Sequence, residues 1–398
     1  MLTNLKPQAA DALLALIKLH DADPRCDKID VGVGVYRTGQ GDTPVFAAIK
    51  AAERRLLESQ TSKAYLGPEG DMGFVHALMP HIFGRADPTR GGRIDGMQTP
   101  GGTGAVRLAL AIAKRAGVKR VWMGTPSWPN HAQIIADLGL ELKGFAHAKP
   151  DGTADLAALL AALDEAGAED AVLLHGCCHN PTGIDYAPAQ WDAIAPALQA
   201  SGVLPLIDLA YQGLGQGMEE DAYGTRRVLA AVPEAIIAYS CDKNFGLYRD
   251  RVGAVYVMTG AADALPVALA NGHALARANW SMPPDHGAAA VRIILEDAAL
   301  TRQWLDELDT MRARMLQVRA RLGAAGMAGK LDLAPLATQN GLFSIVPLSG
   351  PQILALREAH GIYMAGSGRI NIAGLTMGNI DKFIAALAEV GAEAPVAG

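Results

Sequence analysis

The segment Ser240–Arg251, SCDKNFGLYRDR, directly follows an apolar run, AIIAY, that has the composition of a buried strand. It places Lys243 just beyond the end of that strand, and Arg251 follows eight residues later. One interpretation is plain, because strands end at the surface and lysines are usually solvated there. The other is that the amine carries chemistry. The rest of the sequence decides between them.

Similar short apolar runs occur on both sides of this segment, separated by stretches with apolar residues at three- and four-residue spacing. The runs are KRVWMG, DAVLLHG, VLPLIDLA, EAIIAYS and VGAVYVM, between residues 119 and 258. This alternation predicts an α/β fold whose central sheet is mostly parallel and covered by helices on both faces. Ligands of such sheets bind beyond the carboxyl ends of the strands.

The length of 398 residues exceeds what one hydrophobic core usually serves, so two domains are expected. After residue 285 the sequence has long stretches with helical periodicity. Short predicted strands follow, GLFSIVPL, GIYMAG and RINIAG. We expect a large domain over residues 41–300 and a smaller α+β domain formed by residues 1–40 and 301–398. Residues 1–21 are expected to contain an amphipathic helix, and the tail at 391–398 is expected to fray.

Composition excludes several classes of function. The formal net charge of −6 gives no basic footprint for nucleic acid, and no apolar run approaches the length of a membrane span. Four cysteines do not suggest a disulfide framework, so we expect a cytoplasmic protein. The motif HGCCHNPTG crowds His175, Cys177, Cys178 and His179 like metal ligands. Adjacent cysteines in an extended segment point to opposite sides, so we predict no metal site.

Other polar residues also fall where the predicted strands end. Gly101, Gly102 and Thr103 immediately precede a helix, which outlines an anion site, although glycines there are more often simple turn residues. Asp208 ends a buried run, where a carboxylate needs a cation or strong donors unless it caps a helix. A lysine, a buried carboxylate and an anion site explain one another if the anion is the phosphate of pyridoxal 5'-phosphate.

Short segments spread along the sequence resemble those of a known protein family. The matching segments are KIDVGVGVYR, SKAYLGPEG, TPGGTGAVR, TPSWPNH, LLHGCCHNPTG, LIDLAYQG, SCDKNFGLYRDRVGA, RANWSMPPDHGA, QNGLFS and GSGRINIAG, in this order. They are similar to the class I, fold-type I aminotransferases that depend on pyridoxal phosphate, and specifically to the aspartate and aromatic amino acid subgroup. The resemblance covers roughly residues 5–390.

The resemblance implies a role for each matching position around the cofactor ring. Lys243 corresponds to the lysine that binds the cofactor covalently and moves the substrate proton. Asp208 corresponds to the partner of the ring nitrogen, supported by His131. Tyr211 and Asn180 correspond to the pair that binds the phenolic oxygen, and Trp128 to the aromatic ring stacked on the cofactor.

The phosphate and substrate contacts follow in the same way. The resemblance implies phosphate binding by Gly102, Thr103, Ser240 and Arg251, with Tyr65 reaching in from a second subunit of a homodimer. It also implies that Arg369 binds the α-carboxylate of the amino acid, that Arg277 reaches the side-chain carboxylate of substrate in the neighbouring subunit, and that Gly34, Trp128 and Asn180 line the substrate site.

Four positions depart from the family pattern. Asp242 stands where a serine or alanine usually precedes the lysine, and its carboxylate would repel the phosphate unless it points away or pairs with a cation such as Arg249 or Arg251. We predict that it faces away from the cofactor. Gly101 replaces a serine. Met282 and Trp280 replace an asparagine and a tyrosine, which makes the pocket near Arg277 more apolar.

These expectations combine into a transaminase that works by a ping-pong mechanism. It would exchange an amino group between an aromatic or dicarboxylic L-amino acid and 2-oxoglutarate. An aspartate-specialised aminotransferase is the nearest alternative. A decarboxylase or β-lyase on the same scaffold is less consistent with two substrate arginines, Arg277 and Arg369. An inactive binding protein, with its site spoiled by Asp242, is the alternative from another class.

Overall fold

The computed structural model describes residues 1–7 and 12–392. Its contacts divide the chain into two compact units. One runs from Pro44 to Ala313, and the other combines the chain up to Thr43 with the chain from Arg314 onward. The sequence had placed these boundaries near residues 40 and 300. No helix among the described residues has the length and apolarity needed to cross a membrane.

The large unit is built on one seven-stranded sheet with the order β2-β8-β7-β6-β5-β3-β4. Its strands are β2 (Ile94–Pro100), β3 (Arg120–Thr125), β4 (Glu141–Ala146), β5 (Asp170–His175), β6 (Leu204–Leu209), β7 (Ala235–Ser240) and β8 (Val252–Met258). Strands β3 to β7 pair in parallel, whereas β8 runs antiparallel to both of its neighbours, β7 and β2. The predicted mostly parallel sheet is confirmed.

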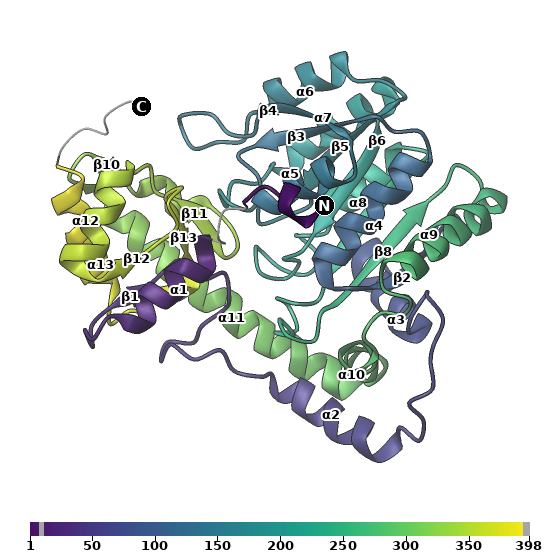
Figure 1. Cartoon of the computed structure of the whole chain (residues 1–398), viewed down its shortest axis with the longest axis horizontal. Helices are drawn as coiled ribbons and strands as arrows, with labels where there is room; N and C mark the ends of the chain where they lie inside the picture. The colour runs from purple at the N-terminus through teal and green to yellow at the C-terminus, as the bar shows by residue number, and fades with distance from the viewer. Residues whose placement is uncertain (8–11, 393–398) are drawn as a thin grey trace. The chain divides into compact units, whose positions relative to one another are not determined.

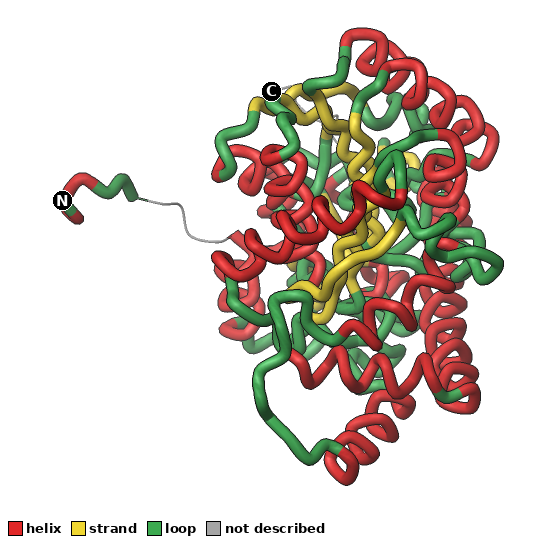
Figure 2. The backbone as a smooth tube through the Cα atoms, turned by 90° about the vertical axis from the view of Figure 1, so that its right-hand side faces the viewer, coloured by secondary structure: helices red, strands yellow, loops and turns green. Residues whose placement is uncertain are grey.

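Helices cover both faces of this sheet, as Figures 1 and 2 show. Helix α4 packs on β2, β6, β7 and β8, and α9 packs on β2 and β8. The helices of the large unit are α2 (Ala47–Ser59), α3 (Met72–Phe83), α4 (Gly101–Arg115), α5 (Pro129–Asp137), α6 (Leu156–Glu165), α7 (Pro188–Ser201), α8 (Tyr223–Ala231), α9 (Leu265–Asn279) and α10 (Asp285–Glu296), with a short 3-10 helix at Ala262–Ala264.

Strand periodicity puts two of the predicted site residues on the face that α4 covers. Side chains two residues apart on a strand point to the same face. Leu206 and Ala238 belong to the core cluster that includes the buried side of α4. Asp208 and Ser240 therefore lie on that same face, at the carboxyl ends of β6 and β7.

Helix α11 (Ala298–Ala324) runs through the boundary between the units. Its first half belongs to the large unit because Trp304 is fully buried there. The ring of Trp304 stacks on Phe245 with centroids 4.3 Å apart, and its Nε1 donates to the carbonyl of Asn244 at 2.7 Å. These contacts hold the two residues that directly follow Lys243, so the loop carrying the lysine is tied to a long helix.

The smaller unit combines short strands with helices. Its elements are a 3-10 helix at Leu2–Asn4, α1 (Ala12–Ala22), β1 (Ile29–Asp30), β9 (Met327–Ala328), β10 (Leu331–Asp332), a 3-10 helix at Ala334–Thr338, β11 (Phe343–Ile345), α12 (Gly350–His360), β12 (Ile362–Tyr363), β13 (Arg369–Asn371), a 3-10 helix at Ile372–Gly374 and α13 (Ile380–Val390). The expected N-terminal helix is present as α1, and residues 393–398 of the tail expected to fray lie outside the described residues.

One buried arginine organises this unit. Arg319 is only 1% exposed, and its guanidinium donates to the hydroxyl of Ser344 and to four backbone carbonyls. A buried cation is tolerated when hydrogen bonds replace its hydration. Arg319 therefore fixes the segment that leads into β11, which pairs with β13, the strand that begins with Arg369.

Candidate active site

Lys243 lies in the turn just after β7, as the sequence analysis expected. Its Nζ is 5.0 Å from the centre of the Tyr211 ring. Burial lowers the pKa of Lys243, and the carboxylates of Asp242 and Asp208 act in the opposite direction. A lowered pKa favours the uncharged amine, which is the form that acts as a nucleophile or a base. The plain interpretation of a solvated lysine is therefore not supported.

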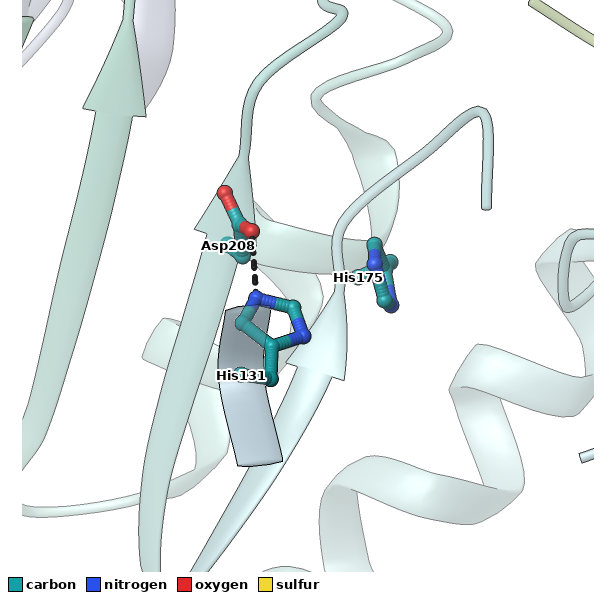
Figure 3. A group of neighbouring side chains, drawn as sticks. All are labelled: His131, His175 and Asp208. Carbon is teal, nitrogen blue, oxygen red and sulfur yellow. Dashed lines mark hydrogen bonds and ion pairs between the residues drawn. The ribbon is translucent and has the colours of Figure 1, made fainter. Parts of the chain in front are cut away.

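Asp208 is buried, and its carboxylate is held by a histidine (Figure 3). His131 Nε2 donates to Asp208 Oδ2 at 2.9 Å, and Ser127 Oγ lies 3.0 Å from His131 Nδ1. Burial alone would raise the pKa of Asp208, but the hydrogen bond and charge of His131, with His175 and Lys243, outweigh it and hold the pKa below its usual value. The site therefore keeps a carboxylate ionised in an apolar setting.

Tyr211 and Asn180 lie together beside this pair. Asn180 Nδ2 donates to the hydroxyl of Tyr211 at 3.4 Å, whereas Asn180 Oδ1 is buried and has no partner. A buried amide oxygen without a partner is costly, so its presence points to a group that is bound there. Trp128 precedes α5, and its ring meets the ring of His131 edge-on with centroids 5.0 Å apart.

The start of α4, Gly101–Thr103, and Ser240 at the end of β7 together form the predicted phosphate site, which we call the phosphate cradle. A Cβ added to Gly102 would lie 2.9 Å from Cβ of Ser240, so only a glycine lets the first turn of α4 approach the end of β7 so closely. Thr103 lies in the same turn, whose backbone N–H groups lack helical partners and therefore favour an anion. The predicted phosphate contacts Gly102, Thr103 and Ser240 are thus brought together by the fold.

Arg251 also reaches this cradle, but a neighbouring carboxylate holds it. Arg251 Nη1 lies 2.5 Å from Asp242 Oδ2, and Asp242 is only 3% exposed. The carboxylate of Asp242 therefore lies beside the start of α4, paired with Arg251, which differs from the predicted orientation away from the cofactor.

The metal-like motif HGCCHNPTG is divided between two places in the structure. His175 faces His131 and Asp208, whereas Cys177 and Cys178 lie next to Asp221. Burial raises the pKa of the Cys177 thiol well above its usual range, which disfavours the thiolate that binds metals. The expectation that the two cysteines point to opposite sides is wrong, because their sulfur atoms lie within 4.8 Å of each other and Cys178 has a φ of +52° instead of an extended conformation.

Sequence reasoning missed a stack of histidines behind the site. The rings of His147 and His179 are parallel with centroids 3.5 Å apart, and His175 lies 4.3 Å from His179. Asp185 holds the turn that carries His179, since it accepts from the backbone N–H groups of Cys178 and His179 at 2.8 Å. His147 lies 32 residues before His179 along the chain, so only the folded sheet reveals the pair.

These buried histidines predict a loss of stability in acid. Burial lowers the pKa of His147 to about 4 and that of His175 to about 3, below the ordinary 6.5 of the unfolded chain. Between those values the unfolded chain binds protons that the folded chain does not, so the stabilisation present above pH 6.5 is lost as the pH falls. For His147 alone the loss is about 3 kcal/mol.

We therefore expect the thermal unfolding midpoint to fall steeply from pH 6.5 to pH 4.5, and the fall to be smaller in the His147→Gln variant. Replacing His286, an exposed histidine, with glutamine is the control and should leave the slope unchanged. Calorimetry at half-unit pH steps measures both. Equal slopes in wild type and His147→Gln would contradict the assignment.

Tyr65, predicted to bind the phosphate of a second subunit, and Arg277, predicted to bind the side-chain carboxylate of the substrate there, are on the surface of the large unit. Tyr65 is 91% exposed, and Arg277 is exposed with Nη1 2.8 Å from Ser281 Oγ. Met282 lines the same pocket as Tyr65, and its Sδ lies 3.0 Å from the backbone nitrogen of Leu66. Trp280 instead packs against the core of the sheet, so Met282 is the departure from the family pattern that lies beside Tyr65.

Arg369 and Gly34 are neighbours within the smaller unit. The guanidinium of Arg369 lies over the ring of Phe343 at 4.4 Å and donates to the carbonyl of Gly32 at 3.2 Å. A Cβ on Gly34 would come within 2.8 Å of the same ring. Phe343 thus supports the arginine and requires a glycine at position 34.

Comparisons with known proteins agree with this geometry. The family model for aminotransferase class I and II matches residues 26–387. The tyrosine aminotransferase of Rhizobium meliloti is 49% identical over 94% of this chain and 96% of its own length, and the aspartate aminotransferase of Escherichia coli K12 is 42% identical over 98% and 100%. A solved aromatic-amino-acid aminotransferase from Burkholderia pseudomallei, covalently bound to pyridoxal phosphate, has a TM-score of 0.93, 32% identity and coverage of 98% and 99%.

A match of this kind runs through both units of the chain and includes the segments that carry the lysine, the buried aspartate and the cradle. This chain belongs to the class I and II aminotransferases.

Proposed function

We propose that the chain is a pyridoxal phosphate-dependent transaminase that exchanges an amino group between an aromatic or dicarboxylic L-amino acid and 2-oxoglutarate. The observation that carries the proposal is the placement of Lys243, in the turn after β7, beside the end of β6, where the buried carboxylate of Asp208 accepts from His131 at 2.9 Å. An amine with a lowered pKa beside a buried carboxylate suits proton transfer at the α-carbon of an amino acid.

The residues present fit the cofactor. Asn180 Oδ1 lacks a partner, and the glycine-lined start of α4 leaves space and N–H donors for a phosphate. Ser240 and Arg251 border that space, and Tyr211 is positioned beside Asn180. When bound, pyridoxal phosphate supplies an aldehyde that takes up the amino group and a protonated ring that withdraws electrons from Cα.

The chain itself supplies binding, charge and proton transfer. Lys243 Nζ takes the proton from the α-carbon of the substrate, and the lowered pKa of this lysine favours the neutral amine that this step needs. Asp208 holds a proton on the ring nitrogen through its own negative charge, and His131 keeps the carboxylate oriented. Arg369, with its planar fork of donors, binds the α-carboxylate.

We further propose that the active unit is a homodimer. Tyr65 and Arg277 are exposed in the single chain, as expected of residues that complete the site of a second copy.

The four cysteines are free, which is consistent with a cytoplasmic location.

Spectra and specificity test the proposal. The purified protein should be yellow, change its spectrum on addition of glutamate and recover with 2-oxoglutarate. The ratio of kcat/KM for aspartate over phenylalanine should stay below about a hundredfold, because Met282 contributes an apolar side chain to the pocket beside Tyr65. A larger ratio, worth more than about 2.7 kcal/mol, would favour the aspartate-specialised alternative. No spectral response after added cofactor would refute a transaminase.

A further inference from the structure

The residue before the lysine, Asp242, is built into the edge of the phosphate cradle. Its Oδ2 lies 2.5 Å from Arg251 Nη1, and its Oδ1 accepts from the backbone nitrogen of Val252 at 3.2 Å. The backbone nitrogen of Asp242 donates to Ser240 Oγ at 3.2 Å. The carboxylate is therefore fixed by contacts on two sides and is not free to turn into solvent.

Gly101 makes room for this ion pair. A Cβ at position 101 would lie 2.5 Å from Arg251 Nη2 and 2.9 Å from Asp242 Oδ2, and the φ of +70° also favours glycine. The two departures from the family pattern at positions 101 and 242 are thus one structural feature. Arg251 binds Asp242 through Nη1, while Nη2 faces the start of α4.

We propose that the carboxylate of Asp242 competes with the phosphate group of the cofactor for Arg251 and so weakens phosphate binding at this site. The inference rests on the proposed function, in which Arg251 binds the phosphate. A phosphate bound at the start of α4 must share the guanidinium with a carboxylate that is already in contact with it. Two anions on one guanidinium repel each other at short range, and Asp242 is only 3% exposed, so little water screens its carboxylate.

A different role for Asp242 would have the opposite sign. If the carboxylate served only to orient Arg251, its removal would loosen the guanidinium and weaken the binding of phosphate. Competition instead requires that removal strengthen it. The sign of one affinity change therefore separates the two roles.

The test is calorimetric titration of the full chain, prepared without cofactor, with pyridoxine 5'-phosphate, pyridoxine and inorganic phosphate. None of these ligands has an aldehyde, so Lys243 cannot bind them covalently. Asp242→Asn should bind both phosphate ligands about tenfold more tightly than wild type and bind pyridoxine equally. Asp250→Asn removes the same charge from the same loop and should behave as wild type. Equal or weaker phosphate binding by Asp242→Asn, or an equal gain in Asp250→Asn, overturns the inference.

A double-mutant cycle with Arg251→Gln adds a second criterion. The gain from Asp242→Asn should disappear when Arg251 is replaced, and a gain that persists overturns the inference. If Asp242→Asn does not fold, Asp242→Ser takes its place in both comparisons. Wild-type protein that fails to bind pyridoxine 5'-phosphate would refute the proposed function as well, whereas normal wild-type binding with no effect of Asp242→Asn refutes only the competition.

Discussion

The Lys243→Ala variant is expected to transfer amino groups at least about 10⁴-fold more slowly than wild type, because it loses both a nucleophile and the base for the substrate proton. Its fold should persist, since the neighbouring Asn244 and Phe245 remain fixed by Trp304. Steady-state rates with glutamate and 2-oxoglutarate measure the loss. After hydride reduction, mass spectrometry should find a pyridoxyl group on the peptide containing residue 243 of the wild type and none in the variant.

Lys149→Ala is the matched control, because this lysine is exposed on the large unit. It should retain wild-type activity and the adduct on Lys243. Activity above about 1% of wild type in Lys243→Ala, or an adduct on another lysine of the wild type, would contradict the assignment.

The same variant tests the proposed homodimer. Lys243→Ala and Arg277→Ala should each be inactive towards dicarboxylic substrates. Unfolding and refolding them together should restore activity if Arg277 serves the site of its partner, because one site of each mixed dimer then has both residues. No recovery in the refolded mixture would contradict a shared site.

The sequence predicted β3 and β5 to β8 of the sheet and missed β2 and β4, whose sequences are not continuously apolar. β5, β7 and β8 consist almost entirely of apolar residues and are buried along nearly all of their length, so composition alone identifies them. β2 has the sequence IDGMQTP, which contains polar residues and a glycine. Gly96 is required there because a Cβ would lie 2.3 Å from the carbonyl oxygen of Val255. β4 is largely exposed at the sheet edge. In both strands, pairing decides the structure more than residue preference does.

The candidate site shows the same limit. Asp208 and Lys243 could be placed from the chain because each ends an apolar run, and parallel strands bring their carboxyl ends to one edge. The ion pair of Asp242 with Arg251 was one of several arrangements that the sequence allowed, since three side chains of this loop carry positive charge. The choice among them depends on space, because Gly101 leaves room only where the first turn of α4 meets the loop.

Replacing Asp208 with asparagine is expected to lower kcat by about 10²–10³-fold, the usual effect of removing one fixed electrostatic group from a site. Asparagine keeps the size of the side chain and removes its charge, so the change isolates electrostatics. The charge of Asp208 is maintained against burial by His131, whose Nε2 lies 2.9 Å away. His131→Asn should therefore lower kcat as well, but only by about tenfold, because the carboxylate remains.

A comparison of KM with kcat distinguishes this role from a structural one. The amino acid is expected to bind through Arg369, a residue that Asp208→Asn leaves unchanged, so KM for glutamate should shift by less than about threefold while kcat falls. A variant with kcat within about threefold of wild type would show that the negative charge at position 208 is not needed for proton removal. The large effect is expected because a buried carboxylate acts at short range, where little solvent screens it.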